Sequence, residues 1–229
     1  LDRVDLVVRP GEVVGLVGES GCGKSTLGRI VARILEPTEG ERLWRGRAYG
    51  AYDNAGSRAE RLAVQMIFQD PFASLNPRLR IADVIGEAPV VHGLVDRAAR
   101  DEYVAQVMSK VGLDASLARR FPHQFSGGQR SRIGIARALA VQPKFLVCDE
   151  AVAALDVSIQ AQVLNLFIKL REEFGLTYLF ISHDLGVVRH LSDRVVIMYL
   201  GRVVESAPCD EMFSRPNHPY TRALLAEVP

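Results

Sequence analysis

The sequence predicts an α/β domain built on a mostly parallel sheet, with a helical subdomain inserted into it. Short apolar stretches rich in β-branched residues alternate with helix-like segments, as in strands that helices cover on both faces. A glycine-rich phosphate-binding loop lies between the first of these stretches and a helix. The predicted strands are Val13 to Val17, Val64 to Phe68, Phe145 to Cys148, Leu176 to Ile181 and Val195 to Tyr199.

The start of the chain reads as a strand-like stretch, Val4 to Val8, followed by a turn at Arg9-Pro10-Gly11. Because the chain begins at Leu1 without an initiator methionine, we interpret it as a piece of a longer polypeptide. It has neither a signal-peptide pattern nor an apolar run of the roughly 20 residues that cross a bilayer. We therefore expect a soluble or peripheral protein.

Residues 18 to 25 read GESGCGKS, which fits the phosphate-binding pattern G-x-x-x-x-G-K-[ST] at every fixed position. In such a loop backbone N–H groups surround a phosphate, the lysine neutralises the outer phosphates, and the last hydroxyl can coordinate Mg²⁺. The alternative is a glycine-rich turn with a solvated lysine, but the strand before the loop and the helical periodicity of Leu27 to Leu35 favour nucleotide binding. The predicted nucleotide ligands are Gly18, Glu19, Ser20, Gly21, Cys22, Gly23, Lys24, Ser25 and Thr26, with Ser25 also on the metal.

The middle of the chain differs from its two ends in composition and in the periodicity of its apolar residues. Residues 45–60 are rich in Gly, Arg and Ala and predict an irregular surface connection. Residues 70–125 carry helical periodicity broken by prolines and contain no strand-like run. We predict that this helical subdomain is inserted into a core formed by residues 1–69 and 126–205, followed by a C-terminal segment, 206–229.

A helix start with two glycines follows the helical subdomain. Phe125 precedes Ser126-Gly127-Gly128-Gln129, and a helix from about Arg130 to Ala140 is predicted to bury Ile133, Ile135, Ala136 and Leu139. Ser126 and Gln129 fit a capping box, which satisfies the first amides of a helix without any ligand. Two glycines in a first turn weaken a helix by roughly 1 kcal/mol each, so we expect a reason for them, such as close approach of a phosphate.

An apolar strand ends in two acids at Asp149 and Glu150. Carboxylates at the carboxyl end of a strand lie where open α/β sheets bind their ligands. Asp149 is predicted to help hold Mg²⁺, and Glu150 to accept a proton from the water that attacks the γ-phosphate. Such a strand is often purely structural, but its presence beside a phosphate-binding loop favours the functional interpretation.

Composition excludes several classes of protein. With 28 basic and 27 acidic residues the net charge is +1, so no global charge attracts nucleic acid. Cys22, Cys148 and Cys209 are odd in number and far apart, which suggests neither a disulfide framework nor a zinc cluster. A reduced cytosolic setting fits this cysteine usage best.

These motifs together resemble ATP-binding cassette (ABC) ATPases. Ser126 to Gln129 is similar to the family's signature motif, and it lies between the phosphate loop and the Asp149-Glu150 strand. Gln69 resembles the Q-loop glutamine, Asp156 in Ala154-Leu155-Asp156 resembles the D-loop aspartate, and His183 resembles the switch histidine. Alone, His183 would be an ordinary loop histidine, but all motifs stand in the family's order along essentially the whole chain.

The resemblance implies a head-to-tail dimer of two ABC ATPase domains that binds ATP and Mg²⁺. Ser126, Gly127, Gly128 and Gln129 of one domain would close on the γ-phosphate held by the phosphate loop of the other. Gln69 would contact Mg²⁺ or the attacking water, His183 would hold the γ-phosphate, and Asp156 would shape the seam between the domains.

Within the family the chain resembles the subgroup of oligopeptide and dipeptide importers, which also includes nickel and glutathione importers. Residues 19–26, 68–77 and 156–162 carry the similarity, together with a His-Pro-Tyr segment at His218-Pro219-Tyr220. That segment also fits a plain helix start with proline in the first turn, so we assign it no catalytic role. The implied partners are transmembrane permease subunits and, indirectly, an external solute-binding protein, with the chain peripheral on the cytoplasmic side of the inner membrane.

Some positions depart from the family pattern. Ala151 stands where the family usually has proline and Ala153 where it often has serine, which predicts an altered D-loop. Phe125 replaces the usual leucine, a tolerable apolar exchange. The resemblance implies that the aromatic residue that stacks on adenine lies upstream of Leu1, so we expect this chain to bind ATP more weakly than the longer parent polypeptide and to discriminate poorly between ATP and GTP.

Two other functions stay open from the sequence. One is an ABC ATPase acting on DNA ends or ribosomes, although such proteins insert long coiled coils or charged linkers that this chain lacks. The other is a regulatory module without turnover, which the intact Lys24, Asp149, Glu150 and His183 disfavour. The transported solute, and whether the dimer is homomeric, heteromeric or a tandem fusion, are not encoded in recognisable form.

Overall fold

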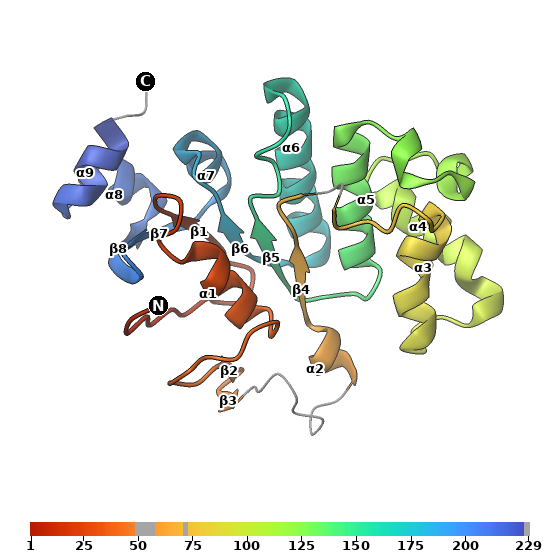
Figure 1. Ribbon diagram of the computed structural model, residues 1–229, viewed down its shortest axis with the longest axis horizontal. Helices are drawn as coiled ribbons and strands as arrows, with labels where there is room; N and C mark the ends of the chain where they lie inside the picture. The colour runs from red at the N-terminus through yellow and green to blue at the C-terminus, as the bar shows by residue number, and fades with distance from the viewer. Residues whose placement is uncertain (49–57, 71–72, 227–229) are drawn as a thin grey trace.

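The computed structural model describes residues 1–48, 58–70 and 73–226, and a mostly parallel sheet runs through its centre (Figure 1). Within these ranges six strands form one sheet in the order β4-β5-β6-β1-β7-β8, and only the β7–β8 pair is antiparallel. A short antiparallel pair, β2 with β3, stands apart from it. The strands are β1 Val13–Val17, β2 Leu43–Trp44, β3 Arg47–Ala48, β4 Val64–Ile67, β5 Phe145–Asp149, β6 Thr177–Ile181, β7 Arg194–Tyr199 and β8 Arg202–Pro208.

The predicted strands are confirmed, with ends that differ by at most one residue. Every residue of β1, β5 and β6 is buried, because each of these strands has a neighbour on both sides and helices over both faces. Strand β8 was not predicted. It forms the sheet edge, where polar residues such as Arg202 and Glu205 remain partly exposed, so it lacks the continuous apolar run of a central strand.

The strand-like stretch Val4 to Val8 is not a strand in the structure. Its alternation is nevertheless real, since Val4, Leu6 and Val8 pack against the cluster around α1 while the residues between them face outward. The segment is tied to the β7–β8 hairpin by single contacts, including the Asp2 N–H donating to Gly201 O at 2.9 Å. Alternating burial without a ladder of backbone bonds therefore misled the prediction.

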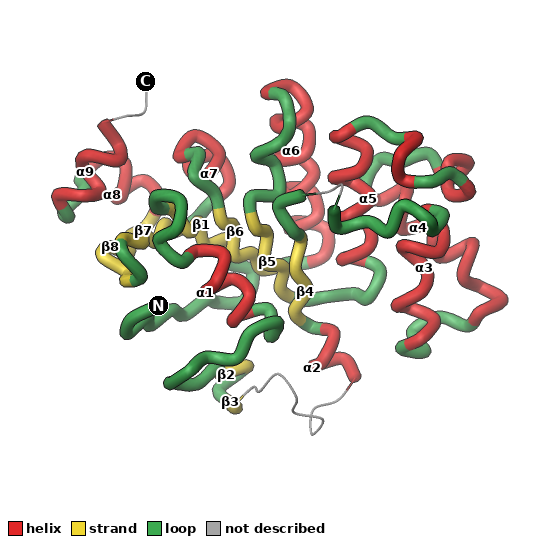
Figure 2. The backbone as a smooth tube through the Cα atoms, in the orientation of Figure 1, coloured by secondary structure: helices red, strands yellow, loops and turns green. Residues whose placement is uncertain are grey.

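Helices lie on both faces of the sheet (Figures 1 and 2). Helix α1, which starts at Lys24 and ends at Val31, packs on one face, where a Cβ at Gly28 would come within 2.7 Å of Ile181 Cδ1. Helices α5, α6 and α7 cover the other face. The helices are α1 Lys24–Val31, α2 Arg58–Leu62, α3 Ile81–Val91, α4 Arg100–Lys110, α5 Gly127–Leu139, α6 Val157–Phe174, α7 Leu185–Leu191, α8 Cys209–Ser214 and α9 Pro219–Ala226, with 3₁₀ turns η1 Arg97–Ala99, η2 Ala115–Arg119 and η3 Pro122–Gln124.

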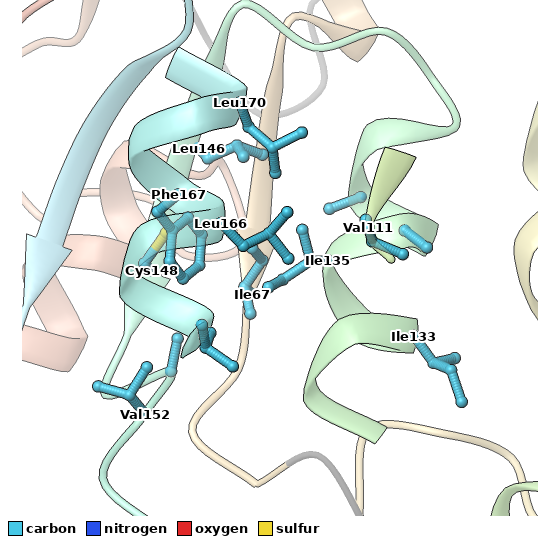
Figure 3. Packing of buried hydrophobic residues seen from close by; sticks show 14 of the residues in the cluster. Ile67, Val111, Ile133, Ile135, Leu146, Cys148, Val152, Leu166, Phe167 and Leu170 are labelled. Atoms are coloured by element: carbon cyan, nitrogen blue, oxygen red, sulfur yellow. The ribbon is translucent and has the colours of Figure 1, made fainter. Parts of the chain in front are cut away.

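The segment predicted as a helical subdomain contains α3, α4 and the three 3₁₀ turns, with no strand in residues 73–125. Pro71 and Phe72, which belong to the predicted subgroup motif, lie outside the described residues, as do residues 49–57 of the predicted surface connection. Ile85 of α3 and Met108 of α4 lie in the same buried cluster as Ile67 of β4 and Leu146 of β5, so this block shares a core with the sheet; Figure 3 shows part of that cluster between α5, α6 and the two strands. The division into core and subdomain stays a prediction.

The predicted burial of α5 is confirmed. Ile133, Ile135 and Ala136 are fully buried, and Leu139 packs against the same cluster from a partly exposed position. Figure 3 shows Ile135 directed toward Leu166 of α6. Helix α5 therefore has a fixed place against the sheet, and the loop before it is held by that packing.

The remaining features concern the surface and the termini. All three cysteines are buried and free. Among the described helices, none is both long and apolar enough to cross a membrane. Helices α8 and α9 fold back beside β8 and β7, so α9 lies near the phosphate loop (Figure 1).

Candidate functional site

Four strands deliver the predicted site residues to one edge of the sheet. The phosphate loop follows β1, Gln69 follows β4, Asp149 and Glu150 end β5, and His183 follows β6. Because these strands are parallel neighbours, their carboxyl ends meet at the same edge. The backbone ties these ends together, since Glu150 N–H donates to Ile181 O at 3.0 Å and Ser182 N–H to Leu16 O at 3.2 Å.

The phosphate loop is folded around the ammonium group of Lys24. Lys24 is only 5% exposed, and its Nζ donates to Gly18 O at 2.6 Å and to Glu19 O at 2.8 Å. A Cβ at Gly18 would lie 2.2 Å from Met198 O, so only glycine fits the start of the loop. The charge of Lys24 is thus held among carbonyl groups at the N-terminus of α1, where an anion is also favoured by the helix dipole.

Asp149 is buried next to the first turn of α1. Ser25 Oγ donates to Asp149 Oδ1 at 2.9 Å, and only 3% of Asp149 is exposed. Burial raises the pKa of this carboxyl, while the bond from Ser25 and the positive charges of Arg29 and Lys24 oppose the rise. A half-buried hydroxyl and a buried carboxylate therefore meet beside the loop, as a hard cation requires.

Glu150 lies between Gln69 and His183. Gln69 Nε2 donates to Glu150 Oε2 at 2.6 Å, and His183 Nδ1 lies 3.3 Å from Glu150 Oε1. The Glu150 side chain is 17% exposed, whereas that of His183 is 61% exposed. A carboxylate has about four acceptor positions, so these two neighbours do not use all of the hydrogen-bonding capacity of Glu150.

The backbone at Glu150 has an unusual conformation. Its φ of 47° is left-handed, a region that costs a side-chain-bearing residue of order 1 kcal/mol or more. A turn follows at once, with Ala153 N–H donating to Glu150 O at 3.1 Å, and Ala151 is buried under it. The chain thus leaves the sheet abruptly, and this turn aims the Glu150 carboxylate back across the strand ends.

Ser126 to Gln129 lies elsewhere. Figure 1 shows α5 and α1 on opposite sides of β4 in this view. The predicted capping box is present, since Gln129 N–H donates to Ser126 Oγ at 3.3 Å and Ser126 N–H to Gln129 Oε1 at 3.0 Å. No hydrogen bond between residues 126–129 and 18–26 occurs in the described part of the chain. The structure therefore does not bring these two predicted nucleotide contacts together within one chain.

The two glycines of this helix start differ in how closely the rest of the chain packs against them. A Cβ at Gly128 would lie 2.4 Å from Ile159 Cγ2 of α6, so Gly128 permits close helix packing. Packing is thus a reason for Gly128 that the sequence did not indicate, and its contact with a ligand stays a prediction. At Gly127 a Cβ would meet only Leu155 Cδ2, at 3.8 Å, so packing inside the chain does not demand a glycine there.

Asp156 caps α6 through its side chain, which accepts from Ile159 N–H at 3.0 Å. The residue itself is exposed, and the following Val157 is 83% exposed. The tip of the predicted D-loop therefore presents an apolar side chain to the surface next to a satisfied carboxylate.

A cavity of about 970 Å³ opens next to the site. Ser25, Gln69 and Asp149 line one part of it, and Arg29, Arg61 and Arg137 line others. Burial lowers the pKa of Arg137, whose guanidinium donates to Ser74 O at 2.5 Å. The cavity thus runs from the acidic strand ends to the helices that precede and follow Gln69.

Sequence reasoning missed one contact of the phosphate loop. Glu19 N–H donates to Tyr220 Oη at 3.1 Å, although the two residues are 201 positions apart. The His-Pro-Tyr segment was recognised, but no local pattern indicates where its tyrosine lies. This contact depends on the path of the whole C-terminal segment.

Comparisons with known proteins agree with this geometry. Residues 1–153 match the family described as "ABC transporter". The chain is 53% identical over 230 residues to the oligopeptide transport ATP-binding protein AppF of Bacillus subtilis (strain 168), covering 100% of this chain and 70% of AppF. It is 51% identical over 231 residues to the oligopeptide transport ATP-binding protein OppF of the same strain, covering 100% of this chain and 76% of OppF.

Solved structures share the fold over almost the whole chain. CbiO1 from Clostridium perfringens, described as part of the ABC transporter complex cbiONQ, superposes with a TM-score of 0.81 at 28% identity, covering 93% of this chain and 83% of that one. The cassette MJ0796, described as dimeric and bacterial, gives 0.78 at 29% identity, covering 90% of this chain and 89% of its own. A second structure of MJ0796, with the same TM-score of 0.78, is described as a post-hydrolysis state bound to ADP and Pi.

Proposed function

The chain belongs to the ABC transporter family, and we propose that it is the ATP-hydrolysing subunit that powers an importer of peptides or similar small solutes. As a member of this family it binds nucleotide, hydrolyses ATP and works as a cassette dimer. The observation that carries the proposal is the meeting of the phosphate loop, Asp149-Glu150, Gln69 and His183 at one sheet edge. Its 53% identity to an oligopeptide transport ATP-binding protein supports the choice of solute class.

Nucleotide binding falls to the loop and the first turn of α1. The loop amides other than that of Glu19, which donates to Tyr220, favour a phosphate group together with the positive end of α1, and the Lys24 ammonium is already placed inside the loop. We assign Lys24 to the outer phosphates, where it would exchange its bonds to Gly18 O and Glu19 O for phosphate oxygens. Ser20 and Thr26 are exposed and can contribute hydroxyl groups.

The residues beside the loop fit a magnesium ion. Ser25 and Gln69 supply neutral oxygen atoms, and Asp149 supplies a carboxylate within hydrogen-bonding reach of Ser25. No cluster of three acidic, cysteine or histidine ligands occurs among the described residues, which suits an ion held by few side chains and the substrate phosphates. When bound, Mg²⁺ neutralises the charge that develops on the phosphates.

Glu150 is the proposed general base. Gln69 and His183 hold its carboxylate over the strand ends, where it can accept a proton from the attacking water. His183 is the more exposed of the two, so it is free to turn toward the γ-phosphate. Gln69, on the segment that leads to the helical block, would report closure of the site to that block.

Two chains would complete each site. The Ser126 to Gln129 helix start of one chain would approach the phosphate loop of the other, with its amides and helix dipole directed at the γ-phosphate. Gly127 is suited to this approach, because its helix turn has room that packing within the chain leaves unused. The exposed pair Asp156 and Val157 would lie in the seam between the chains.

The proposed partners are transmembrane permease subunits, with an external solute-binding protein acting through them. The chain would sit as a peripheral subunit on the cytoplasmic side of the inner membrane. The names of its relatives, oligopeptide transport ATP-binding proteins, support this placement. Closure of the dimer on ATP and its reopening after hydrolysis would be the two states that drive the permease.

Hydrolysis is tested by phosphate release from ATP with and without Mg²⁺, over a wide range of protein concentration. We expect a rate per chain that depends on Mg²⁺ and rises with concentration as dimers form. A rate that is the same in EDTA would contradict the assigned metal site, and a rate per chain independent of concentration would contradict the shared site.

Import is tested with a chimera in which this chain replaces the matching region of OppF in Bacillus subtilis. We expect uptake of a radiolabelled tripeptide to return, and the same chimera carrying Glu150→Gln to fail. A chimera that accumulates to the level of OppF and hydrolyses ATP, yet imports no peptide, would contradict the peptide class.

A further inference from the structure

The His-Pro-Tyr segment, which the proposed function leaves without a role, touches the phosphate loop. Tyr220 Oη accepts a hydrogen bond from Glu19 N–H at 3.1 Å. The Tyr220 ring packs in a tilted arrangement against Tyr199 at the end of β7, with ring centroids 4.3 Å apart and an angle of 34° between planes. The hydroxyl is therefore presented to the loop by a ring that is itself fixed against the sheet.

The geometry of one peptide group decides what this contact does. Gly18 C=O and Glu19 N–H belong to the same peptide, which is trans, so they point in opposite directions. Gly18 O accepts from Lys24 Nζ at 2.6 Å, on the side where the loop surrounds its ligand. Glu19 N–H consequently points out of the loop, where it donates to Tyr220 Oη. Tyr220 therefore does not compete with a phosphate for this N–H group.

The segment that carries Tyr220 is anchored independently of the loop. Glu205 on β8 accepts the N–H groups of Asn217 at 2.8 Å and His218 at 3.0 Å, just before α9 begins. Burial raises the pKa of Glu205, but the neighbouring Thr221 hydroxyl and these two N–H groups lower it below its usual value, so the anchor is an ionised carboxylate at neutral pH. Leu224 and Leu225 then pack α9 against the apolar cluster of β7 and α8.

The hydroxyl of Tyr220 is suited to a permanent contact. Burial raises the pKa of Tyr220, so the group stays neutral and keeps its own proton for a second partner. An apolar ring with one polar tip is half-buried here, which is the usual arrangement for a tyrosine that reaches from a core to a backbone group.

We propose that Tyr220 is a positioning residue that braces the Gly18–Glu19 peptide from outside and so holds the phosphate loop ready for the triphosphate. This inference rests on the proposed function, since the loop must bind ATP for the brace to matter. The brace acts on the binding loop and touches neither Glu150 nor His183. It therefore stabilises bound ATP and the transition state alike, and its loss raises KM while kcat is preserved.

The test is Tyr220→Phe, which keeps the ring on Tyr199 and removes only the acceptor oxygen. We expect the Kd for ATP, measured by calorimetry, and the KM for Mg-ATP to rise about two- to tenfold, as the loss of one ordinary hydrogen bond predicts, with kcat changed less than about twofold. Tyr103→Phe is the matched control, because it removes a hydroxyl that donates to Ala140 O at 2.7 Å in the helical block. It should leave Kd and KM unchanged.

A second variant tests the route through the anchor. Glu205→Ala removes the acceptor of both amides before α9 and should raise Kd at least as much as Tyr220→Phe. The double variant should bind ATP no more weakly than Glu205→Ala alone, because both changes break the same brace. If the losses of ATP affinity in the two single variants added up in the double variant, Tyr220 and Glu205 would act by separate routes, which contradicts the proposal. That conclusion holds also when all variants melt at the temperature of the parent protein.

The outcomes separate this inference from the proposed function. A parent chain that binds ATP without hydrolysing it contradicts the proposed ATPase activity. Comparing its Kd for ATP with that of Tyr220→Phe still tests the brace. An unchanged Kd in Tyr220→Phe overturns the brace whether or not ATP is hydrolysed. Tighter binding in that variant also overturns it, since Tyr220 would then be competing with a phosphate for Glu19 N–H.

Discussion

The phosphate-loop edge of the sheet and the helix start at Ser126 differ in how complete they are. At the sheet edge both predicted carboxylates contact other predicted site residues, as in the Ser25–Asp149 bond at 2.9 Å and the Gln69–Glu150 bond at 2.6 Å. At the helix start, the side chains of Ser126 and Gln129 each bond the other's backbone N–H. One chain therefore holds a nearly finished site and a separate surface that has no substrate of its own.

The two regions are stabilised by different kinds of contact. The sheet edge is held by buried strands and by charged groups that depend on one another. The helix start is held by its capping box and by Gly128 against Ile159, so it folds correctly without a nucleotide. A preformed donor surface costs little to reorganise when it meets a triphosphate, which favours its use across an interface.

The largest expected effect breaks the sheet edge. Glu150→Gln removes the proton acceptor and keeps the shape of the side chain, so kcat should fall about 10²- to 10⁴-fold while ATP binding persists. Phosphate release and calorimetry measure the two quantities, and exposed Glu172→Gln is the matched control. Turnover within about twofold of the parent would remove Glu150 from the base role.

The next effect breaks the helix start alone. Ser126→Arg places a long cation in the proposed seam, so the hydrolysis rate at high protein concentration should fall about 10²-fold while each chain still binds ATP. Ser109→Arg, on an exposed position of α4, is the control. Ser126→Asp keeps a capping residue and should also lose activity, because it brings a negative charge to the γ-phosphate.

If Ser126→Asp hydrolysed ATP like the parent chain, loss of the helix cap would explain the arginine variant. The helix start would then have no part in the reaction. Sedimentation of both variants with ATP distinguishes failed dimer closure from failed chemistry.

A stability measurement sharpens the contrast within the helix start. Gly128→Ala forces a Cβ to within 2.4 Å of Ile159 Cγ2 and should lower the free energy of unfolding by about 1–3 kcal/mol, measured in urea. Gly127→Ala meets only Leu155 Cδ2 at 3.8 Å and should leave that free energy unchanged or raise it by up to about 1 kcal/mol, because alanine favours a helix more than glycine does. Equal losses in the two variants would contradict the packing role of Gly128.

The smallest effect concerns the free-energy cost of burying the Asp149 carboxylate at the sheet edge. Burial raises the pKa of Asp149 in the folded chain, so its contribution to stability is present below its unfolded pKa and lost as the pH rises through the folded value. Asp149→Asn should therefore raise the free energy of unfolding near pH 7, and the gain should shrink toward about pH 4. Exposed Asp210→Asn should show no such trend.

The same variant should bind Mg-ATP more weakly than the parent, since it removes the carboxylate assigned to the metal. A gain in stability with a loss in affinity would mark Asp149 as a residue kept for function. If Asp149→Asn were less stable than the parent at both pH values, ionised Asp149 would be stabilising the fold, which contradicts the raised pKa.

Much of the fold followed from local sequence. The central strands are continuous apolar runs, and the phosphate loop is a spacing rule, so both were visible without a structure. The order of strands was not, because β1 lies between β6 and β7, which are far from it in the chain. Edge strand β8 was not predicted because its partly exposed polar residues interrupt the apolar run that marks a central strand. Val4 to Val8 was wrongly predicted to be strand-like because burial alternates there although the segment pairs with no strand.

The candidate site was predictable only in part for the same reason. Gln69, Glu150 and His183 follow different strands, and their meeting depends on the parallel order of those strands. The role of Gly128 depends on Ile159 of another helix, and the contact of Tyr220 with the loop joins residues 201 positions apart. Spacing rules indicate which residues carry chemistry, whereas the structure shows what holds them.

We propose that each active site is shared by two chains, and a mixture of two inactive variants tests this sharing. Lys24→Ala removes the loop lysine and Ser126→Arg blocks the helix start, so each variant alone should hydrolyse almost no ATP. In a head-to-tail dimer of the two, one site combines an intact loop with an intact helix start. An equimolar mixture should then regain about one quarter of the parent rate, since about half of the dimers are mixed and each has one working site. A mixture as inactive as its components, with mixed dimers shown to form, would contradict the shared site.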